Sequence, residues 1–399
     1  MKKPELLAPA GDLEKLKIAI IYGADAVFIG GKEFSLRSKA SNFTMDDIKE
    51  AVTFAHLHHA RVHITVNVYP HNEDLEGLEQ YLIDLDSANV DAIIVSSPFI
   101  IATAKRLNCH FELHLSTQQS IANVEAINFW ADLGINRVVL AREETIEEIE
   151  KIKESTNVPI EVFIHGGMCS GFSGRCTLSN YLTLRDANRG GCAHSCRWYY
   201  DLYTNSQLLS SSDKPFRIGS KDLMAFESLK DLIDLGTDSL KIEGRMKSIH
   251  YVASIVSSYR YFIDYYYDHP DCDIDALVKE CIDMARKAEN RDTSTGFLKG
   301  QVTSDGGLYE NGDEIPPQDF IGIVCGHHEG LTLIEQRNYF QINQKIEIIQ
   351  PHQEATIATI KAMYDINMTP IEVATHAMDQ IYIDLQGYYP DYAIIRKAE

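Results

Sequence analysis

Short apolar runs alternate with longer amphipathic stretches from Glu5 to Glu243. The short runs are rich in Val, Ile and Leu, which is typical of strands buried on both faces. In the longer stretches apolar residues recur every three or four positions, which indicates helices. The predicted strands are Glu5–Ala8, Ala26–Gly30, Val62–Asn67, Ala92–Ser96, Phe111–Ser116, Arg137–Ala141, Ile160–His165 and Ser239–Glu243. The predicted helices include Leu13–Tyr22, Met45–His59, Leu75–Ala88, Val124–Leu133 and Glu144–Ser155.

Capping residues support these boundaries. Asp12 and Thr44 precede two helices as N-caps, and Gly23, Asn89 and Gly134 follow three helices as C-caps. Eight strands that alternate with helices predict a TIM-like (β/α)8 barrel over residues 1–270. The alternative is an open doubly wound sheet. We expect the barrel, because the repeat continues past six units and no phosphate-binding glycine fingerprint follows the first strand.

The pattern changes beyond residue 270. A helix at Ile274–Ala288 and a glycine-rich stretch at Asn290–Gly312 predict a helical spacer and linker over residues 271–316. Short strands with polar turns then predict a C-terminal all-β barrel domain over residues 317–399. Its predicted strands are Phe320–Val324, Leu331–Ile334, Lys345–Ile349, Thr356–Tyr364, Ile371–Ala374 and Gln380–Ile383.

A cysteine- and glycine-rich insertion at about residues 166–215 interrupts the last unit of the predicted barrel. It contains Cys169, Cys176, Cys192 and Cys196, with six, fifteen and three residues between them. Four thiolates suit either tetrahedral zinc or an iron–sulfur cluster. The irregular spacing favours the cluster, because structural zinc prefers two tight ligand pairs. Small buried cysteines that bind nothing are the plain alternative.

Three further elements are predicted in and after the insertion. Trp198–Tyr203 and Phe216–Ile218 have the pattern of a hairpin, and Asp222–Leu235 has that of a helix. Ile249–Tyr267 is a long aromatic-rich helix, which we expect to pack against the barrel.

Composition narrows the class of protein. The 399 residues are 45% hydrophobic and 24% charged, which is ordinary for a globular protein. The N-terminus has no apolar core of a signal peptide, and no run approaches the length of a membrane span. We therefore expect a cytoplasmic protein without a membrane partner. Its thiols should be reduced, which favours metal binding over disulfides.

Charge is distributed unevenly along the chain. The net charge of −21 argues against general nucleic-acid binding. Between His165 and Lys221, however, the sequence contains seven basic residues and only three acidic ones. A basic stretch is most simply a solvated surface, but its overlap with the cysteines favours an anionic substrate. The residues concerned in the insertion are Arg175, Arg185, Arg189 and Arg197.

Polar side chains follow the predicted strands, where barrel enzymes place their chemistry. We expect one pocket formed by Asn67, Gln118, Arg142, His165, Lys241, Glu243 and Arg245. Arg245 has the planar fork that binds a carboxylate through two hydrogen bonds. Its plain alternative is an ion pair with Glu243 or Glu143. His165 is a reasonable proton-transfer group near neutral pH.

The chain resembles the collagenase-like peptidase family, peptidase family U32, and within it the tRNA-hydroxylating branch. The matching stretches are Glu5–Gly11, His114–Gln118, Glu161–Cys176, Gly191–Trp198, Lys241–Lys247 and Arg291–Gly300, together with the terminal β-domain. The resemblance implies an oxygen-independent hydroxylase with a [4Fe–4S] cluster. In this branch the substrate is the wobble uridine of tRNA, and prephenate supplies the hydroxyl group.

The resemblance also implies roles for particular residues. Cys169, Cys176 and Cys192 match cluster positions, and Cys196 is the nearest candidate for the fourth ligand. We expect catalytic residues at Gln118, His165, Glu243 and Arg245, donor-binding residues at Asn67, Arg142 and Lys241, and tRNA contacts at Arg175, Arg185, Arg189 and Arg197. The alternatives are a peptidase, a ribosomal-RNA hydroxylase and a zinc-stabilised RNA chaperone.

Overall fold

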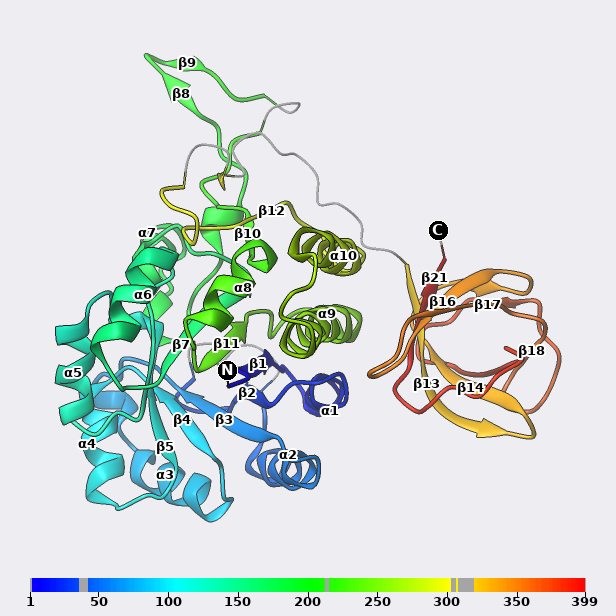
Figure 1. Ribbon diagram of the computed structural model, residues 1–399, viewed down its shortest axis with the longest axis horizontal. Helices are drawn as coiled ribbons and strands as arrows, with labels where there is room; N and C mark the ends of the chain where they lie inside the picture. The colour runs from blue at the N-terminus through cyan, green and yellow to red at the C-terminus, as the bar shows by residue number, and fades with distance from the viewer. Residues whose placement is uncertain (1, 36–41, 212–214, 303–305, 308–318, 399) are drawn as a thin grey trace.

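The structure, a computed structural model, describes residues 2–35, 42–211, 215–302, 306–307 and 319–398. Eight parallel strands close into a barrel, because β11 pairs with both β1 and β7 (Figure 1). The barrel strands are β1 (Glu5–Pro9), β2 (Ala26–Gly30), β3 (Arg61–Val66), β4 (Ala92–Val95), β5 (Glu112–Leu115), β6 (Arg137–Val139), β7 (Ile160–Gly166) and β11 (Ser239–Ile242). The predicted TIM-like barrel is confirmed.

Helices surround the barrel. They are α1 (Leu13–Ile21), α2 (Met45–Leu57), α3 (Leu78–Ser87), α4 (Pro98–Arg106), α5 (Val124–Asp132), α6 (Ile146–Ser155), α8 (Phe226–Asp234) and α9 (Ile249–Asp268), with short turns η1 (Asn72–Asp74) and η2 (Thr117–Gln119). The predicted caps are confirmed. Asp12 and Thr44 accept hydrogen bonds from first-turn N–H groups, and Gly23, Asn89 and Gly134 have positive φ.

The insertion folds as a cluster of short elements between β7 and β10. They are η3 (Phe172–Gly174), α7 (Leu178–Thr183), η4 (Ala187–Arg189), η5 (Ser195–Arg197), β8 (Tyr203–Thr204) and β9 (Gln207–Leu208). The β8–β9 hairpin projects at the top of Figure 1. The predicted hairpin was too wide: Tyr200 and Phe216 form only an isolated bridge, and the tight pairing lies between Tyr203 and Leu208.

The start of the predicted helix Asp222–Leu235 is wrong. Residues Asp222–Met224 form strand β10, which pairs antiparallel with the end of β7 and parallel with β12 (Thr293–Ser294). The helix α8 begins only at Phe226. Asp222 is fully buried and forms ion pairs, which an exposed first helical turn would not provide.

The C-terminal part is a separate antiparallel β-domain, on the right of Figure 1. Its main sheet has the order β17-β16-β21-β13-β14-β20-β18. The strands are β13 (Phe320–His328), β14 (Leu331–Gln336), β16 (Lys345–Ile349), β17 (Thr356–Thr359), β18 (Met363–Tyr364), β20 (Gln380–Ile383) and β21 (Ile394–Lys397), with a second pair of β15 (Phe340–Gln341) and β19 (Val373–Ala374). The sequence did not predict β21, although it lies centrally in the sheet.

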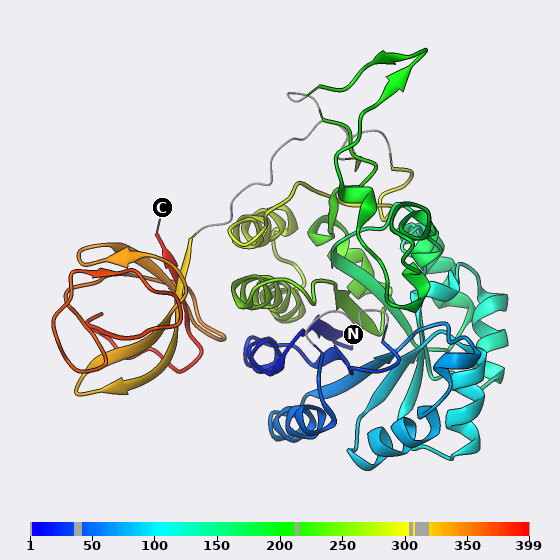
Figure 2. The ribbon, with the colours of Figure 1, turned by 180° about the vertical axis from the view of Figure 1, so that it is seen from behind.

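The spacer helix α10 (Ile274–Arg286) matches its prediction. Part of the predicted linker, residues 303–305 and 308–312, lies outside the described residues. The β-domain packs beside α1, α9 and α10, as both views of the ribbon agree (Figures 1 and 2). Ile323, Ile349 and Ile394 of this domain belong to the same hydrophobic core as the barrel helices.

Candidate functional site

A network of ion pairs between strands β6, β7 and β11 lies inside the barrel. The Lys241 ammonium donates to Glu161 at 2.6 Å, and Arg137 Nη1 lies 3.4 Å from the same carboxylate. Burial raises the pKa of Glu161, but the charges of Lys241 and Arg137 outweigh it and hold the pKa below its usual value. Lys241 therefore forms an ion pair with Glu161 of β7 inside the barrel. This ion pair competes with the predicted contact between Lys241 and an anionic donor.

The Gln118 carboxamide lies at the C-terminal mouth of the barrel. Its oxygen accepts hydrogen bonds from Asn67 Nδ2 at 2.9 Å, Ser96 Oγ at 2.9 Å and Ser116 Oγ at 3.0 Å. Three donors fix which end is the oxygen, so the orientation of the amide follows from the network. Gln118 is buried, and its Nε2 has no hydrogen-bond partner among the described residues.

The insertion rests on this mouth through η3. A Cβ atom on Gly174 would lie 3.1 Å from Cγ of Gln118, so the two backbones approach closely. Ser173 is fully buried and donates through its N–H and hydroxyl to the Glu143 carboxylate. The Arg142 N–H in turn donates to Ser173 Oγ at 3.0 Å. The loop after β6 therefore holds the segment that leads to Cys176.

Two predicted arginines border the mouth. The Arg142 guanidinium lies 3.7 Å from the ring centroid of Phe163 on β7, which is a cation–π contact. Arg245 is buried and donates to Asn42 Oδ1 at 2.6 Å and to Ser35 Oγ at 3.4 Å. A Cβ atom on Gly30 would lie 2.5 Å from Arg245 Nη1, so the guanidinium crosses the end of β2.

His165 does not join this mouth, contrary to expectation. Its Nδ1 lies 3.2 Å from the Tyr259 hydroxyl on α9, and its Nε2 lies 2.5 Å from Glu289 Oε1. The register between β7 and β11 shifts beside His165, and this irregularity turns the side chain outward. Glu243 lies next to this position, where its N–H donates to the carbonyl of His165 at 2.8 Å.

Asp222 is an important residue that the sequence did not reveal as part of the site. Its buried carboxylate lies 2.9 Å from Arg197 Nη2, 3.5 Å from Arg291 Nη1 and 3.9 Å from Lys247 Nζ. Burial raises the pKa of Asp222, but Arg197 and Lys247 outweigh it and lower the pKa overall. In the sequence it was predicted only as the first residue of a helix, Asp222–Leu235.

The four cysteines of the insertion are free thiols, and two of them, Cys169 and Cys192, are exposed. Burial raises the pKa of Cys196, Ser170 and Arg197 lower it, and Cys169 and Cys192 raise it further, so these three thiols lie in one neighbourhood. A Cβ atom on Gly171 would lie 2.9 Å from Cβ of Cys176.

The donor set fits an iron–sulfur cluster in its chemistry, since four thiols share one glycine-rich insertion at the end of a barrel strand. Among the residues that the structure describes, no group of three or more His, Cys, Asp or Glu side chains is arranged to hold a metal ion. Cluster binding would therefore have to bring the thiols together.

The four predicted tRNA-contacting arginines divide into two pairs. Arg189 Nη2 lies 3.0 Å from Glu73 and 2.7 Å from Asp74, and Arg197 pairs with Asp222. These two side chains anchor the insertion to the barrel. Arg175 and Arg185 are exposed, and Arg175 Nε donates to Ser120 Oγ at 2.9 Å. The contact of this exposed pair with phosphates stays a prediction.

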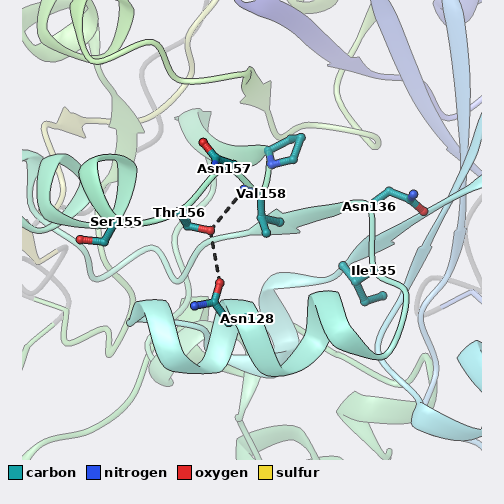
Figure 3. Close-up of a pocket in the computed structure, with 8 residues that line it drawn as sticks. Asn128, Ile135, Asn136, Ser155, Thr156, Asn157 and Val158 are labelled. Carbon is teal, nitrogen blue, oxygen red and sulfur yellow. Dashed lines mark hydrogen bonds between the residues drawn. The ribbon is translucent and has the colours of Figure 1, made fainter.

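A shallow depression lies at the opposite end of the barrel (Figure 3). It is lined by Asn128, Ile135, Asn136, Ser155, Thr156, Asn157, Val158 and Pro159. Thr156 Oγ1 contacts Asn128 at 3.4 Å and accepts from the Val158 N–H at 3.2 Å. These bonds stabilise the turn before β7, far along the strand from the cysteines. No helix among the described residues has the length and apolar character to cross a bilayer.

Comparison with known proteins supplies the family. The peptidase family U32 model matches residues 11–306, and the peptidase family U32 C-terminal domain model matches residues 316–396. The tRNA hydroxylation protein P1 of Bacillus subtilis is 46% identical over 100% of this chain and 96% of its own length. The tRNA hydroxylation protein P of Escherichia coli is 31% identical over 88% of this chain and 87% of its own length. A 23S rRNA 5-hydroxycytidine synthase of Escherichia coli is 39% identical over 72% of this chain and 42% of its own length. The chain therefore belongs to peptidase family U32.

Proposed function

We propose that this protein is an RNA hydroxylase that modifies tRNA. The observation that carries the proposal is the 46% identity, over the whole chain, to a protein named for tRNA hydroxylation. The exposed arginines of the insertion support an RNA substrate, because phosphates bind basic side chains. The finer expectation, that the wobble uridine is the target, follows from the resemblance to the tRNA branch.

We further propose that Cys169, Cys176, Cys192 and Cys196 hold a [4Fe–4S] cluster. When bound, such a cluster supplies one-electron chemistry beside the barrel mouth. Arg197 is a residue that would balance part of its negative charge, since Asp222 and then the nearby thiols of Cys196 and Cys169 raise the pKa of its guanidinium against the effect of burial. Asp222 holds that guanidinium in place.

The hydroxyl donor that we propose is a dicarboxylate, prephenate. Arg142 and Arg245 are cations that follow the strands β6 and β11 at the mouth, and the Gln118 amide lies at the same end of the barrel. An arginine fork and an amide N–H both suit carboxylate oxygens. Asn67 orients Gln118 rather than binding the donor itself. Lys241 supports the barrel wall through Glu161.

Nucleoside mass spectrometry of tRNA tests the function. A strain that lacks this protein and any second hydroxylation pathway should lose hydroxyuridine derivatives, and this chain should restore them. Ribosomal RNA from the same cells is analysed in parallel, because one relative acts on that substrate. If tRNA is unchanged and ribosomal RNA is altered, the substrate of this protein is ribosomal RNA and not tRNA. Unchanged RNA of both kinds, with cleavage of a collagen peptide by the purified protein, would favour the peptidase.

Replacement of the four insertion cysteines by serine tests the cluster. Each variant should lose iron relative to the wild type after anaerobic purification, since a neutral hydroxyl is a poor substitute for a thiolate. Cys325→Ser is the matched control, because Cys325 is an exposed free thiol of the β-domain. Full iron content in the Cys196→Ser protein would remove that residue from the set. Full content in all four variants would contradict the site.

A further inference from the structure

The insertion exposes an unusual amount of apolar surface. Among the described residues, eleven of the twenty-six exposed large hydrophobic side chains lie between Phe172 and Ile218. They are Phe172, Tyr181, Leu182, Leu184, Trp198, Tyr199, Leu202, Tyr203, Leu208, Leu209 and Ile218. Such concentration on the surface marks an interaction site rather than random exposure.

Leu184, at the end of α7, is the clearest member of this set. Its side chain is 94% exposed, and its backbone has φ of 54° as the C-cap of the helix. A left-handed conformation is unfavourable for leucine, and glycine would be the ordinary residue there. The chain therefore holds a large apolar side chain in solvent at a position where it gains neither burial nor backbone relaxation.

The surroundings of Leu184 suit RNA. Tyr181, one turn earlier on α7, is 84% exposed, and the adjacent Arg185 is also exposed. The exposed Arg175 and Arg185 give the insertion local positive charge in a chain of net charge −21, whereas Arg189 and Arg197 of the same stretch are paired with carboxylates. An aromatic ring stacks on any base, and a neighbouring cation contacts phosphate. A protein partner would need no such local positive charge.

The helix α7, which ends next to Leu184, is also packed against the segments that carry the cysteines. α7 lies between Cys176 and Cys192 in the chain. It contacts both η4 and η5, and η5 contains Cys196. The Ala193 N–H donates to Ser179 Oγ of α7 at 3.0 Å, which ties the two cysteine segments to this helix. The start of α7 is therefore packed against the cysteine-bearing segments.

We propose that the end of α7, formed by Tyr181, Leu184 and Arg185, is a wedge that enters an RNA loop and replaces the target base in its stack. The inference rests on the proposed function, since an enzyme that modifies a base must take it out of the stack. Leu184 fills the vacated space as an apolar wedge, Tyr181 stacks on a neighbouring base, and Arg185 contacts the backbone. The extruded base is then directed toward the cysteines of the same insertion.

A stem–loop RNA with 2-aminopurine next to the loop uridine tests the wedge. Wild-type protein should raise the fluorescence of 2-aminopurine on binding, because extrusion of the uridine unstacks its neighbour. Leu184→Gly keeps the backbone conformation and removes the wedge, so it should bind the RNA within about threefold of wild type and lose most of the fluorescence rise. Tyr181→Ala should weaken binding by about tenfold, the scale of one stacked base.

Two matched controls show that exposure alone is not enough. Leu57 at the end of α2 is 75% exposed, and Tyr388 of the β-domain is 76% exposed. Leu57→Gly and Tyr388→Ala should leave RNA affinity and fluorescence unchanged. A single cooperative thermal transition in every variant excludes misfolding.

The outcomes separate the wedge from the proposed function. A Leu184→Gly protein that raises the fluorescence as wild type does, while the wild type modifies tRNA, overturns the wedge alone. If instead Leu184→Gly abolishes a concentration-dependent dimer in sedimentation and leaves RNA binding intact, the tip serves a second copy of the chain and the inference is wrong. Absence of both RNA binding and tRNA modification by the wild type overturns the inference and the proposed function together.

Discussion

Glu144 is buried at the start of α6, close to two other carboxylates. Burial raises its pKa to about 7, with further contributions from Glu148 and Glu143. The folded protein therefore prefers the neutral acid at a pH where the unfolded chain is ionised. The stabilisation from this group is fully present below the unfolded pKa and is lost as the pH rises through about 7.

We therefore expect Glu144→Gln to be nearly neutral at pH 5 and to stabilise the protein at pH 8. A gain of about 1 kcal/mol in the free energy of unfolding is a reasonable scale for a group near partly solvated neighbours. Urea unfolding at both pH values measures it. Glu147→Gln, in an exposed position of the same helical turn, is the control. A gain of equal size at pH 5 would contradict the ionisation argument.

At the same scale, sequence reasoning predicted which residues follow the strands better than where they point. Gln118 and Asn67 were predicted at the barrel mouth, and a hydrogen bond of 2.9 Å joins them there. The prediction that the His165 side chain lies in the mouth was wrong, because it assumed that side chains alternate along β7 without interruption. At this point β7 carries one extra residue, Ile164, relative to β11, which reverses the side chain of His165, and nothing in the neighbouring residues signals such a shift.

The insertion as an element is held to the barrel by the buried ion pair between Arg197 and Asp222. Arg197 reaches Asp222 on β10, and a Cβ atom on Gly167 would lie 3.1 Å from its Nη2. The guanidinium thus crosses the segment that leads to Cys169. Removal of one partner from such a pair leaves an uncompensated buried charge, which costs about 3–5 kcal/mol.

Asp222→Asn should therefore release the segment around Cys196 without unfolding the barrel. The expected signs are faster reaction of the cysteines with a thiol reagent, earlier tryptic cleavage after Arg197, and lower iron content. Asp201→Asn, an exposed acid of the same insertion, is the control. Wild-type thiol reactivity in Asp222→Asn would show that the ion pair does not hold the segment.

The strands and helices of the barrel could be predicted from the sequence because each short apolar run lies between capped helices, as the N-caps Asp12 and Thr44 show. The strand β10 was not readable, since its three residues continue directly into the amphipathic pattern of α8. What makes Asp222 a strand residue is pairing with β7 and β12 and its three cationic neighbours. These contacts come from distant parts of the chain.

At the scale of the whole molecule, the β-domain is fixed to the barrel by polar as well as apolar contacts. Arg396 Nη1 lies 3.3 Å from His250 Nε2 on α9, and Lys287 Nζ lies 3.0 Å from Glu347 Oε1. The His250 ring stacks on Phe320, with 5.6 Å between the ring centroids. These contacts fix the β-domain against the outer helices of the barrel.

Tyr22 of α1 is the centre of this contact. Its buried hydroxyl lies 2.9 Å from the Ile349 carbonyl and 3.0 Å from the Tyr392 carbonyl, and it accepts from the Ile394 N–H at 3.2 Å. Tyr22→Phe removes the hydroxyl and leaves that N–H without its acceptor in the interface, which should cost about 1–3 kcal/mol. We expect a lower thermal midpoint and earlier proteolytic release of the β-domain, while the barrel keeps its circular dichroism. Tyr267→Phe, on the exposed end of α9, should change neither measurement. If Tyr22→Phe resists proteolysis as well as wild type does, apolar packing of Ile323, Ile349 and Ile394 alone is sufficient to dock the domain.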